Sequence, residues 1–122
     1  MKTLALALPL ALLSSTALAG WQYSSPPAIS SGFVYGDLRS TRTSSTADAL
    51  LGCGVTYNAG IGTEAYCYAD DGTTSVSCTT TDSGFIEVVK SMNSYGYLSF
   101  AWDTSTGECT GIGFDADSAG LP

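Results

Sequence analysis

The stretch of sequence that decides the fold is residues 49–79, ALLGCGVTYNAGIGTEAYCYADDGTTSVSCT. It contains three runs with the composition of β-strands, 49–57, 63–69 and 74–79, separated by connectors rich in glycine, asparagine and aspartate. An Asp-Gly pair between two such runs is a strong signal for a tight hairpin. The stretch therefore predicts two consecutive β-hairpins, and hence three neighbouring antiparallel strands.

The two hairpin loops fix a register for these strands. If the loop 58–62 closes the first hairpin and a four-residue loop 71–74 closes the second, Cys53 falls opposite Cys67, and Cys67 opposite Cys78. Side chains alternate between the two faces of a strand, so the three cysteines share one face with most of the apolar residues of the stretch. We expect this cysteine face to be the core face.

The chain has four cysteines, an even number, which predicts two disulfides in an oxidising compartment. Cys53 and Cys78 would lie two strands apart, about 9.5 Å, which is too far for a bridge. Two pairings remain open: Cys53–Cys67 with Cys78–Cys109, which we favour, and Cys67–Cys78 with Cys53–Cys109. No C-x-x-C pair is present, so we expect no zinc site.

The opposite face of the same strands is polar and aromatic. In this register Tyr66 lies opposite Gly54, and Tyr68 lies opposite Gly52. One interpretation is a flat platform for a sugar ring or a partner strand; the other is that the tyrosines cover the glycine backbone and protect the sheet. The candidate binding residues are the two tyrosines and three polar neighbours: Tyr66, Tyr68, Glu64, Ser77 and Thr79.

Outward from this stretch, the hydrophobic period changes. Phe85, Val89 and Met92 recur at helical spacing, which predicts one short helix over 82–93. Strand-like runs precede it at 33–38 and follow it at 95–102 and 108–114, where Leu98, Phe100, Trp102, Ile112 and Phe114 are assigned to the core. We predict a single β-rich α+β domain over 33–115, with an antiparallel sheet of about five or six strands and one helix packed on one face.

The two ends of the chain have different compositions from the middle. Residues 1–19 have the layout of a secretory signal peptide, with Lys2, an apolar run over 4–13 that is too short to span a bilayer, and small residues up to Ala19. We expect an irregular Pro/Ser-rich leader over 20–32 and a frayed tail over 116–122. The predicted location is therefore secreted or periplasmic.

Charge and composition exclude several functions. The chain has a net charge of −7, and loss of Lys2 with the signal peptide would leave −8, so nucleic acid is not an expected partner. The sequence contains no histidine, which excludes a Ser-His-Asp triad and a His-ligated zinc site. Paired acids such as Asp70 and Asp71 sit on a predicted turn, where they serve turn chemistry and solubility. We expect no enzyme activity, no cofactor and no metal.

The stretches LLGCGV, AYCYADDGTTSVSCTTTD and YLSFAWDTSTGECTGI resemble a group of small, uncharacterised secreted proteins of Gram-negative bacteria. In that group a cysteine strand precedes a cysteine hairpin, a short helix and a terminal hairpin that ends in G-x-C-T. The resemblance covers about the last seventy residues. It implies bacterial export and two disulfides, and it carries over no functional residue.

These observations favour a non-catalytic binding module for carbohydrate or another surface polymer, with a neutral polysaccharide or a surface protein as the candidate partner. The second hypothesis is a structural or assembly subunit, whose leader or edge strand pairs with a neighbouring molecule. The third is a small hydrolase that uses carboxylates alone, which would require two acids converging in a pocket.

Overall fold

The computed structural model describes residues 25–116. The predicted signal peptide, the first part of the leader and most of the predicted tail lie outside these residues. The described chain forms seven strands and two short helices: β1 (Ala28–Ser30), β2 (Phe33–Asp37), α1 (Leu38–Arg42), β3 (Leu50–Asn58), β4 (Gly62–Asp70), β5 (Ser75–Thr80), α2 (Ser83–Ser91), β6 (Tyr97–Trp102) and β7 (Cys109–Asp115).

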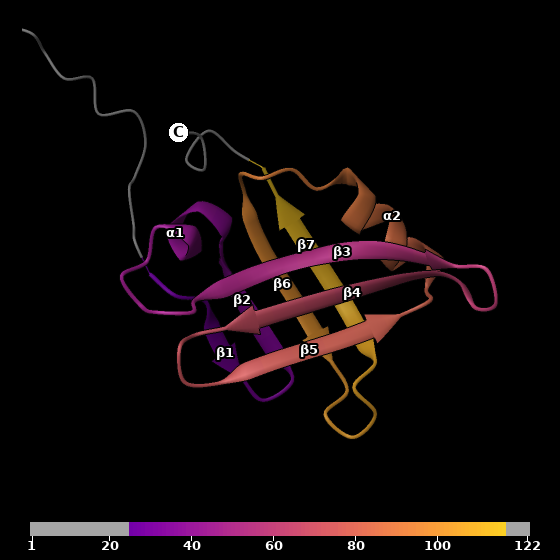
Figure 1. Cartoon of the computed structure of the whole chain (residues 1–122), viewed down its shortest axis with the longest axis horizontal. Helices are drawn as coiled ribbons and strands as arrows, with labels where there is room; N and C mark the ends of the chain where they lie inside the picture. The colour runs from indigo at the N-terminus through magenta and orange to yellow at the C-terminus, as the bar shows by residue number, and fades with distance from the viewer. Residues whose placement is uncertain (1–24, 117–122) are drawn as a thin grey trace, which may run out of the picture.

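The strands form two antiparallel sheets, with the orders β1-β2-β6-β7 and β3-β4-β5. Figure 1 shows the three-stranded sheet lying over the four-stranded sheet, with the strands of the two layers crossing at an angle. The α+β class and the antiparallel pairing are as predicted, but the single sheet of five or six strands with one helix is wrong. Alternation shows which face of a strand is buried. It does not show that the strand at 33–37 pairs with a strand at 97–101 rather than with the next strand in sequence, at 50–58.

The predicted register of the three-stranded sheet is confirmed. Cys53 pairs with Cys67, Cys67 with Cys78, and Asp70 with Ser75 across the second hairpin. The first hairpin closes when Ile61 N–H donates to the Asn58 carbonyl, 3.0 Å away.

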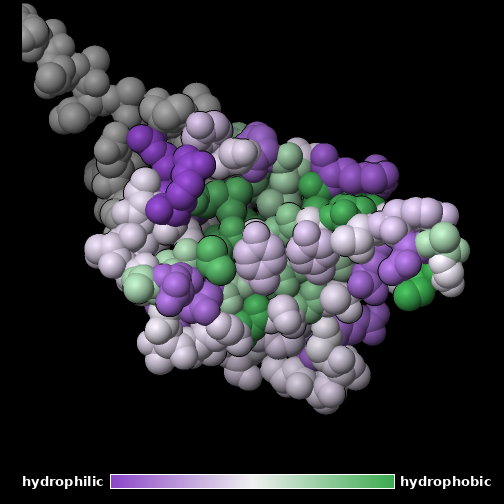
Figure 2. All heavy atoms as spheres, in the orientation of Figure 1, coloured by the Kyte–Doolittle hydropathy of each residue, from purple (hydrophilic) through white to green (hydrophobic). Residues whose placement is uncertain are grey.

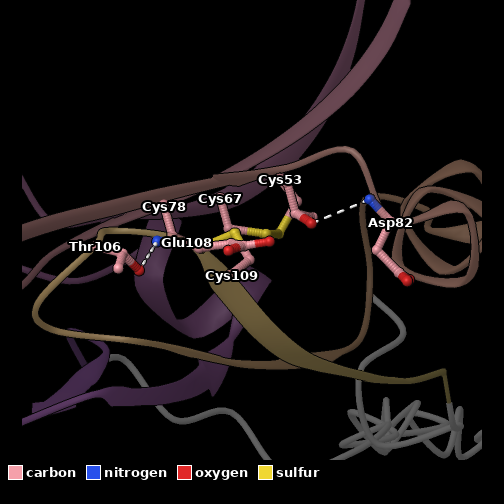
Figure 3. The surroundings of a disulfide bond; sticks show 8 residues. Cys53, Cys67, Cys78, Asp82, Thr106, Glu108 and Cys109 are labelled. Atoms are coloured by element: carbon pink, nitrogen blue, oxygen red, sulfur yellow. Dashed lines mark hydrogen bonds between the residues drawn. A yellow bond between two sulfur atoms is a disulfide. The ribbon is translucent and has the colours of Figure 1, made fainter.

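The favoured disulfide pairing is also confirmed. Cys53–Cys67 joins two directly paired residues of one sheet, with a Cα–Cα distance of 4.0 Å. Cys78–Cys109 joins β5 of the three-stranded sheet to β7 of the four-stranded sheet, where Cys109 is the first residue of the strand. The Cα–Cα distance of this bridge is 5.1 Å. Figure 3 shows the two bridges side by side, between the Thr106–Glu108 turn and the start of α2 at Asp82. The second bridge therefore ties the two layers together.

A short contact between the sheets reinforces this bridge. Thr79 forms an isolated parallel bridge with Glu108, and Thr79 N–H donates to the Gly107 carbonyl at 3.3 Å. Within the same turn, Glu108 N–H donates a hydrogen bond to Thr106 Oγ1 at 3.3 Å. The start of β7 is thus held beside β5 by both covalent and hydrogen bonds.

The core lies between the two sheets and α2. The four-stranded sheet contributes Val34, Leu98 and Phe100, all at most 1 % exposed, and Ile112 packs against the same core. The three-stranded sheet contributes its cysteine face, as predicted. The helix closes one side with the buried residues Phe85, Ile86 and Val89, while Met92, just past its end, is partly buried.

The helix begins and ends close to the predicted positions. Asp82 caps its N-terminus, where its Oδ1 accepts a hydrogen bond from Phe85 N–H at 2.8 Å. Lys90 lies in the last turn and forms an exposed ion pair with Glu87 at 3.3 Å. The apolar stripe of α2 therefore faces the core and its charged residues face solvent.

Two elements were not predicted. The leader, expected to be irregular over 20–32, contains β1, which pairs with β2 around a turn where Gly32 has a φ of +78°. The polar segment after residue 37 contains α1, which Asp37 caps by accepting from Ser40 N–H at 2.7 Å. Both elements are short, three and five residues, so their local sequence signals are weak. Among the described residues, no helix is long and apolar enough to cross a membrane.

Candidate functional site: the tyrosine face

Strand β4 places the candidate tyrosines on the outside of the molecule. Ala65, Cys67 and Ala69 alternate with them and are buried in the core. Tyr66 is 37 % exposed and Tyr68 is 40 % exposed. The strict alternation of small buried residues with large aromatic ones therefore produces an outer surface with two tyrosine rings, as the sequence predicts.

Both rings lie across the neighbouring strand β3. A Cβ atom added to Gly54 would lie 2.5 Å from Tyr66 Cζ, and one added to Gly52 would lie 2.9 Å from the Tyr68 hydroxyl. Only glycine leaves room for a ring at these two positions. The close approach supports the structural interpretation of the glycines, because one side of each ring covers strand backbone.

The two rings form a nearly flat pair. Their planes differ by 19° and their centroids are 6.3 Å apart. Because both lie over the same strand and are displaced along it, their outer sides point in the same direction. Figure 2 views this side of the molecule: residues of intermediate hydropathy lie in the middle of the face among hydrophobic ones, and strongly hydrophilic residues lie toward its margins.

Hydroxyl groups border this pair on β5, which lies on the other side of β4 from the glycines of β3. Ser77 is paired with Tyr68, and Thr79 with Tyr66, and both are exposed. Glu64 follows on β4 at the next outward position, opposite Thr56. The structure thus brings all five candidate residues onto one face, hereafter the tyrosine face: Glu64, Tyr66, Tyr68, Ser77 and Thr79.

A shallow recess of about 250 Å³ adjoins the tyrosine face at Tyr68. Its lining includes Leu50, Asp70, Ser75 and Ser77. Hydrogen bonds from the Ser75 hydroxyl and from Gly72 N–H, the latter at 2.7 Å, lower the pKa of Asp70 below its ordinary value. Asp70 is therefore an ionised acceptor at neutral pH.

Sequence reasoning missed this recess. It assigned Asp70 to turn chemistry, and the turn role is present, since Asp71 also accepts from Thr73 and Thr74 N–H groups at 2.8 and 2.7 Å. The available signal was the register itself, because pairing of Asp70 with Ser75 and of Leu50 with Asp70 places these residues at one end of the sheet. The same register places Leu50, an exposed apolar residue, at the end of the polar face where the recess lies.

Several other acids occupy turns and helix caps, such as Asp37, Asp82 and Asp103. Asp103 accepts from the Ser105 hydroxyl and from Ser105 N–H, which lowers its pKa. Within residues 25–116 no group of three or more acids or cysteines is arranged to hold a metal ion. All four cysteines are in disulfides, so none is a free thiol. The chemistry that the tyrosine face offers is therefore ring contact and hydrogen bonding.

No family model, no curated protein and no solved structure matches this chain. The class of function therefore has to be inferred from the tyrosine face and the fold that carries it.

Proposed function

We propose that this chain is a non-catalytic binding module for a neutral polysaccharide, which acts in the periplasm or as a secreted protein. The single observation that carries the proposal is the geometry of Tyr66 and Tyr68, two nearly parallel rings 6.3 Å apart with their outer sides exposed. A flat apolar pair of this kind fits the flat faces of successive sugar rings.

The rings are held in place before a ligand arrives. Their inner sides already rest over Gly52 and Gly54, so the two side chains would lose little conformational freedom when a ligand binds. A tyrosine also has only two side-chain torsions to fix, which keeps the entropic cost of contact low. Pre-organisation of this kind favours affinity because less ordering opposes binding.

Polar groups at the border suit the hydroxyl groups of a sugar. Ser77 and Thr79 can donate or accept hydrogen bonds, and the carboxylates of Glu64 and Asp70 accept them. The net charge of −7 disfavours anionic polymers, so uncharged glycans are the preferred ligand class. Two disulfides agree with an oxidising environment, and the predicted signal peptide supports export.

The test compares two double variants with the parent protein on a glycan array. Tyr66→Ala with Tyr68→Ala removes both rings, and if each ring contributes about 1 kcal/mol, affinity should fall roughly thirtyfold. Tyr66→Phe with Tyr68→Phe keeps the rings and should retain most of the binding. Tyr57→Ala is the matched control, because Tyr57 is 75 % exposed at the far end of β3.

Thermal unfolding of the same proteins separates binding from a purely structural role. If the rings serve only to cover strand backbone, the double alanine variant will melt at a lower temperature and bind glycans as the parent does. That combination of results, or a parent protein that binds no neutral glycan, would exclude the proposed function.

A further inference from the structure

A second group of exposed aromatic residues lies on the outer face of the four-stranded sheet. On β2, Val34 points into the core and is fully buried, so Phe33 and Tyr35 point outward, as does Tyr97 on β6. Their exposed fractions are 42, 44 and 42 %. We call Phe33, Tyr35 and Tyr97 the aromatic strip; it belongs to the opposite layer from the tyrosine face.

The strip is continuous and runs from one strand to the next. The ring centroids of Phe33 and Tyr35 are 6.0 Å apart, and those of Tyr35 and Tyr97 are 6.1 Å apart with planes inclined by 29°. The outward neighbours on the adjoining strands are small: Ala101 is paired with Phe33, and Ser99 with Tyr35. No large side chain at these paired positions covers the rings.

Two carboxylates flank one end of the strip. Tyr97 is paired with Asp37 on one side and with Asp115 on the other. Directly opposed residues have Cβ atoms roughly 5 Å apart, so both acids start beside Tyr97. The Asp37 carboxylate also caps α1 by accepting from Ser40 N–H, whereas Asp115 is exposed. The residues paired with Tyr66 and Tyr68 are instead glycines and hydroxyl residues.

The described positive charges lie on the two helices and not on the strands that form this surface. None of the described strands contains a lysine or an arginine; Arg39 and Arg42 lie in α1, and Lys90 lies in α2. Arg42 already lies over the Tyr95 ring, 5.8 Å from its centroid, and Lys90 pairs with Glu87. The aromatic strip is therefore a π-rich surface flanked by carboxylates, on strands that carry no lysine or arginine.

We propose that the aromatic strip is a binding site for a small soluble quaternary ammonium compound. The electron-rich faces of Tyr35 and Tyr97 attract a cation, and methyl groups around the nitrogen match their apolar character. Asp37 and Asp115 add charge complementarity without requiring a hydrogen-bond donor on the ligand. Burial and the neighbouring Tyr35 raise the pKa of Tyr97, so its phenol stays neutral well into the alkaline range.

This site is independent of the proposed glycan function, because it uses a different sheet and different residues. The test is a titration of the ¹⁵N-labelled protein followed by NMR, with tetramethylammonium chloride as the probe. We expect saturable shifts in 33–37, 97–99 and 111–115. tert-Butanol, a neutral molecule of similar shape, and sodium chloride at equal ionic strength should not reproduce these shifts.

Variants assign the binding to the strip. Tyr35→Leu with Tyr97→Leu should weaken binding about tenfold, whereas Tyr66→Leu with Tyr68→Leu, on the other layer, should leave it unchanged. Asp115→Asn should weaken tetramethylammonium binding about threefold and reduce the dependence of this binding on salt. Because Asp115 is exposed, this variant still tests the proposal if the double leucine variant does not fold. Equal shifts with tert-butanol, or parental affinity in the Asp115→Asn and leucine variants, would overturn the proposal.

Discussion

Gly52 and Gly54 determine how the two tyrosines can lie, because a side chain at either position would occupy the space of a ring. In a strand interior, glycine lacks a side chain to pack and loses more backbone entropy on folding than other residues. The rings compensate for this cost by covering the glycine backbone. The same contact holds the rings flat, so the structural and binding interpretations of the tyrosine face are compatible at the level of single residues.

Gly54→Ala tests this arrangement. The new Cβ would lie 2.5 Å from Tyr66 Cζ, so the ring must move away, and we expect a loss of about 1 kcal/mol in the free energy of unfolding. Urea denaturation measures the loss, and quenching of tyrosine fluorescence reports the displaced ring. Gly60→Ala is the control, because a Cβ there meets nothing within 4 Å. Equal stability of the two variants would show that Tyr66 gains nothing from lying over Gly54.

At the scale of elements, α2 separates its buried apolar residues clearly from its exposed charged residues. Val89 is 7 % exposed and faces the cysteine side of the sheet, so Val89→Asp would force an unpaired charge into a small core. Such a burial can exceed the whole net stability of a domain this size, and we expect the variant not to fold. Circular dichroism and NMR dispersion measure the outcome.

Glu87→Asp is the matched control for this helix. Its side chain is exposed, so the variant should remain folded despite the lower helix propensity of aspartate. A well-folded Val89→Asp protein with native NMR dispersion would mean that the apolar stripe of α2 does not pack in the core.

The elements that could be predicted are those with strong local patterns. The hairpins of β3, β4 and β5 follow from Asp-Gly turn chemistry and period-two alternation, and α2 follows from its apolar spacing and Asp82 cap. The five residues of the tyrosine face followed from the same alternation. The four-stranded sheet could not be predicted, because β2 pairs with β6 across more than fifty residues of chain.

The aromatic strip was missed for the same reason. Phe33 and Tyr35 alternate with Val34, which is visible in the sequence, but Tyr97 joins them only through the long-range pairing of β2 with β6. The recess beside Tyr68 likewise depends on side chains from three strands. Sites assembled across strands require the sheet order, and the sheet order was the wrong part of the sequence-based prediction.

At the scale of the whole molecule, the two disulfides are expected to differ in their contributions to stability. In the chain-entropy description, closing the 14-residue and 31-residue separations contributes roughly 3 and roughly 3.7 kcal/mol at 25 °C. The longer closure also connects the two layers. We therefore expect Cys78→Ala with Cys109→Ala to lower the free energy of unfolding more than Cys53→Ala with Cys67→Ala.

Urea denaturation of both double variants measures this difference, and non-reducing mass spectrometry of the parent should show two bridges, no free thiol and no bound zinc. If loss of Cys78–Cys109 costs only about 0.7 kcal/mol more than loss of Cys53–Cys67, the connection between the layers adds nothing beyond loop closure, and equal costs would contradict the prediction. Reduction of the parent protein provides the reference in which both bridges are absent.

The bridges also determine how the molecule would respond to mechanical tension. A pull applied to residues 25 and 116 passes through sulfur at Cys53–Cys67 and at Cys78–Cys109, so the backbone between each pair stays slack. Nearly half of the described chain, including α2 and β6, is thereby shielded from extension. Gly54 and Tyr66 both lie inside the first shielded segment, so such a pull would not extend the backbone of this half of the tyrosine face.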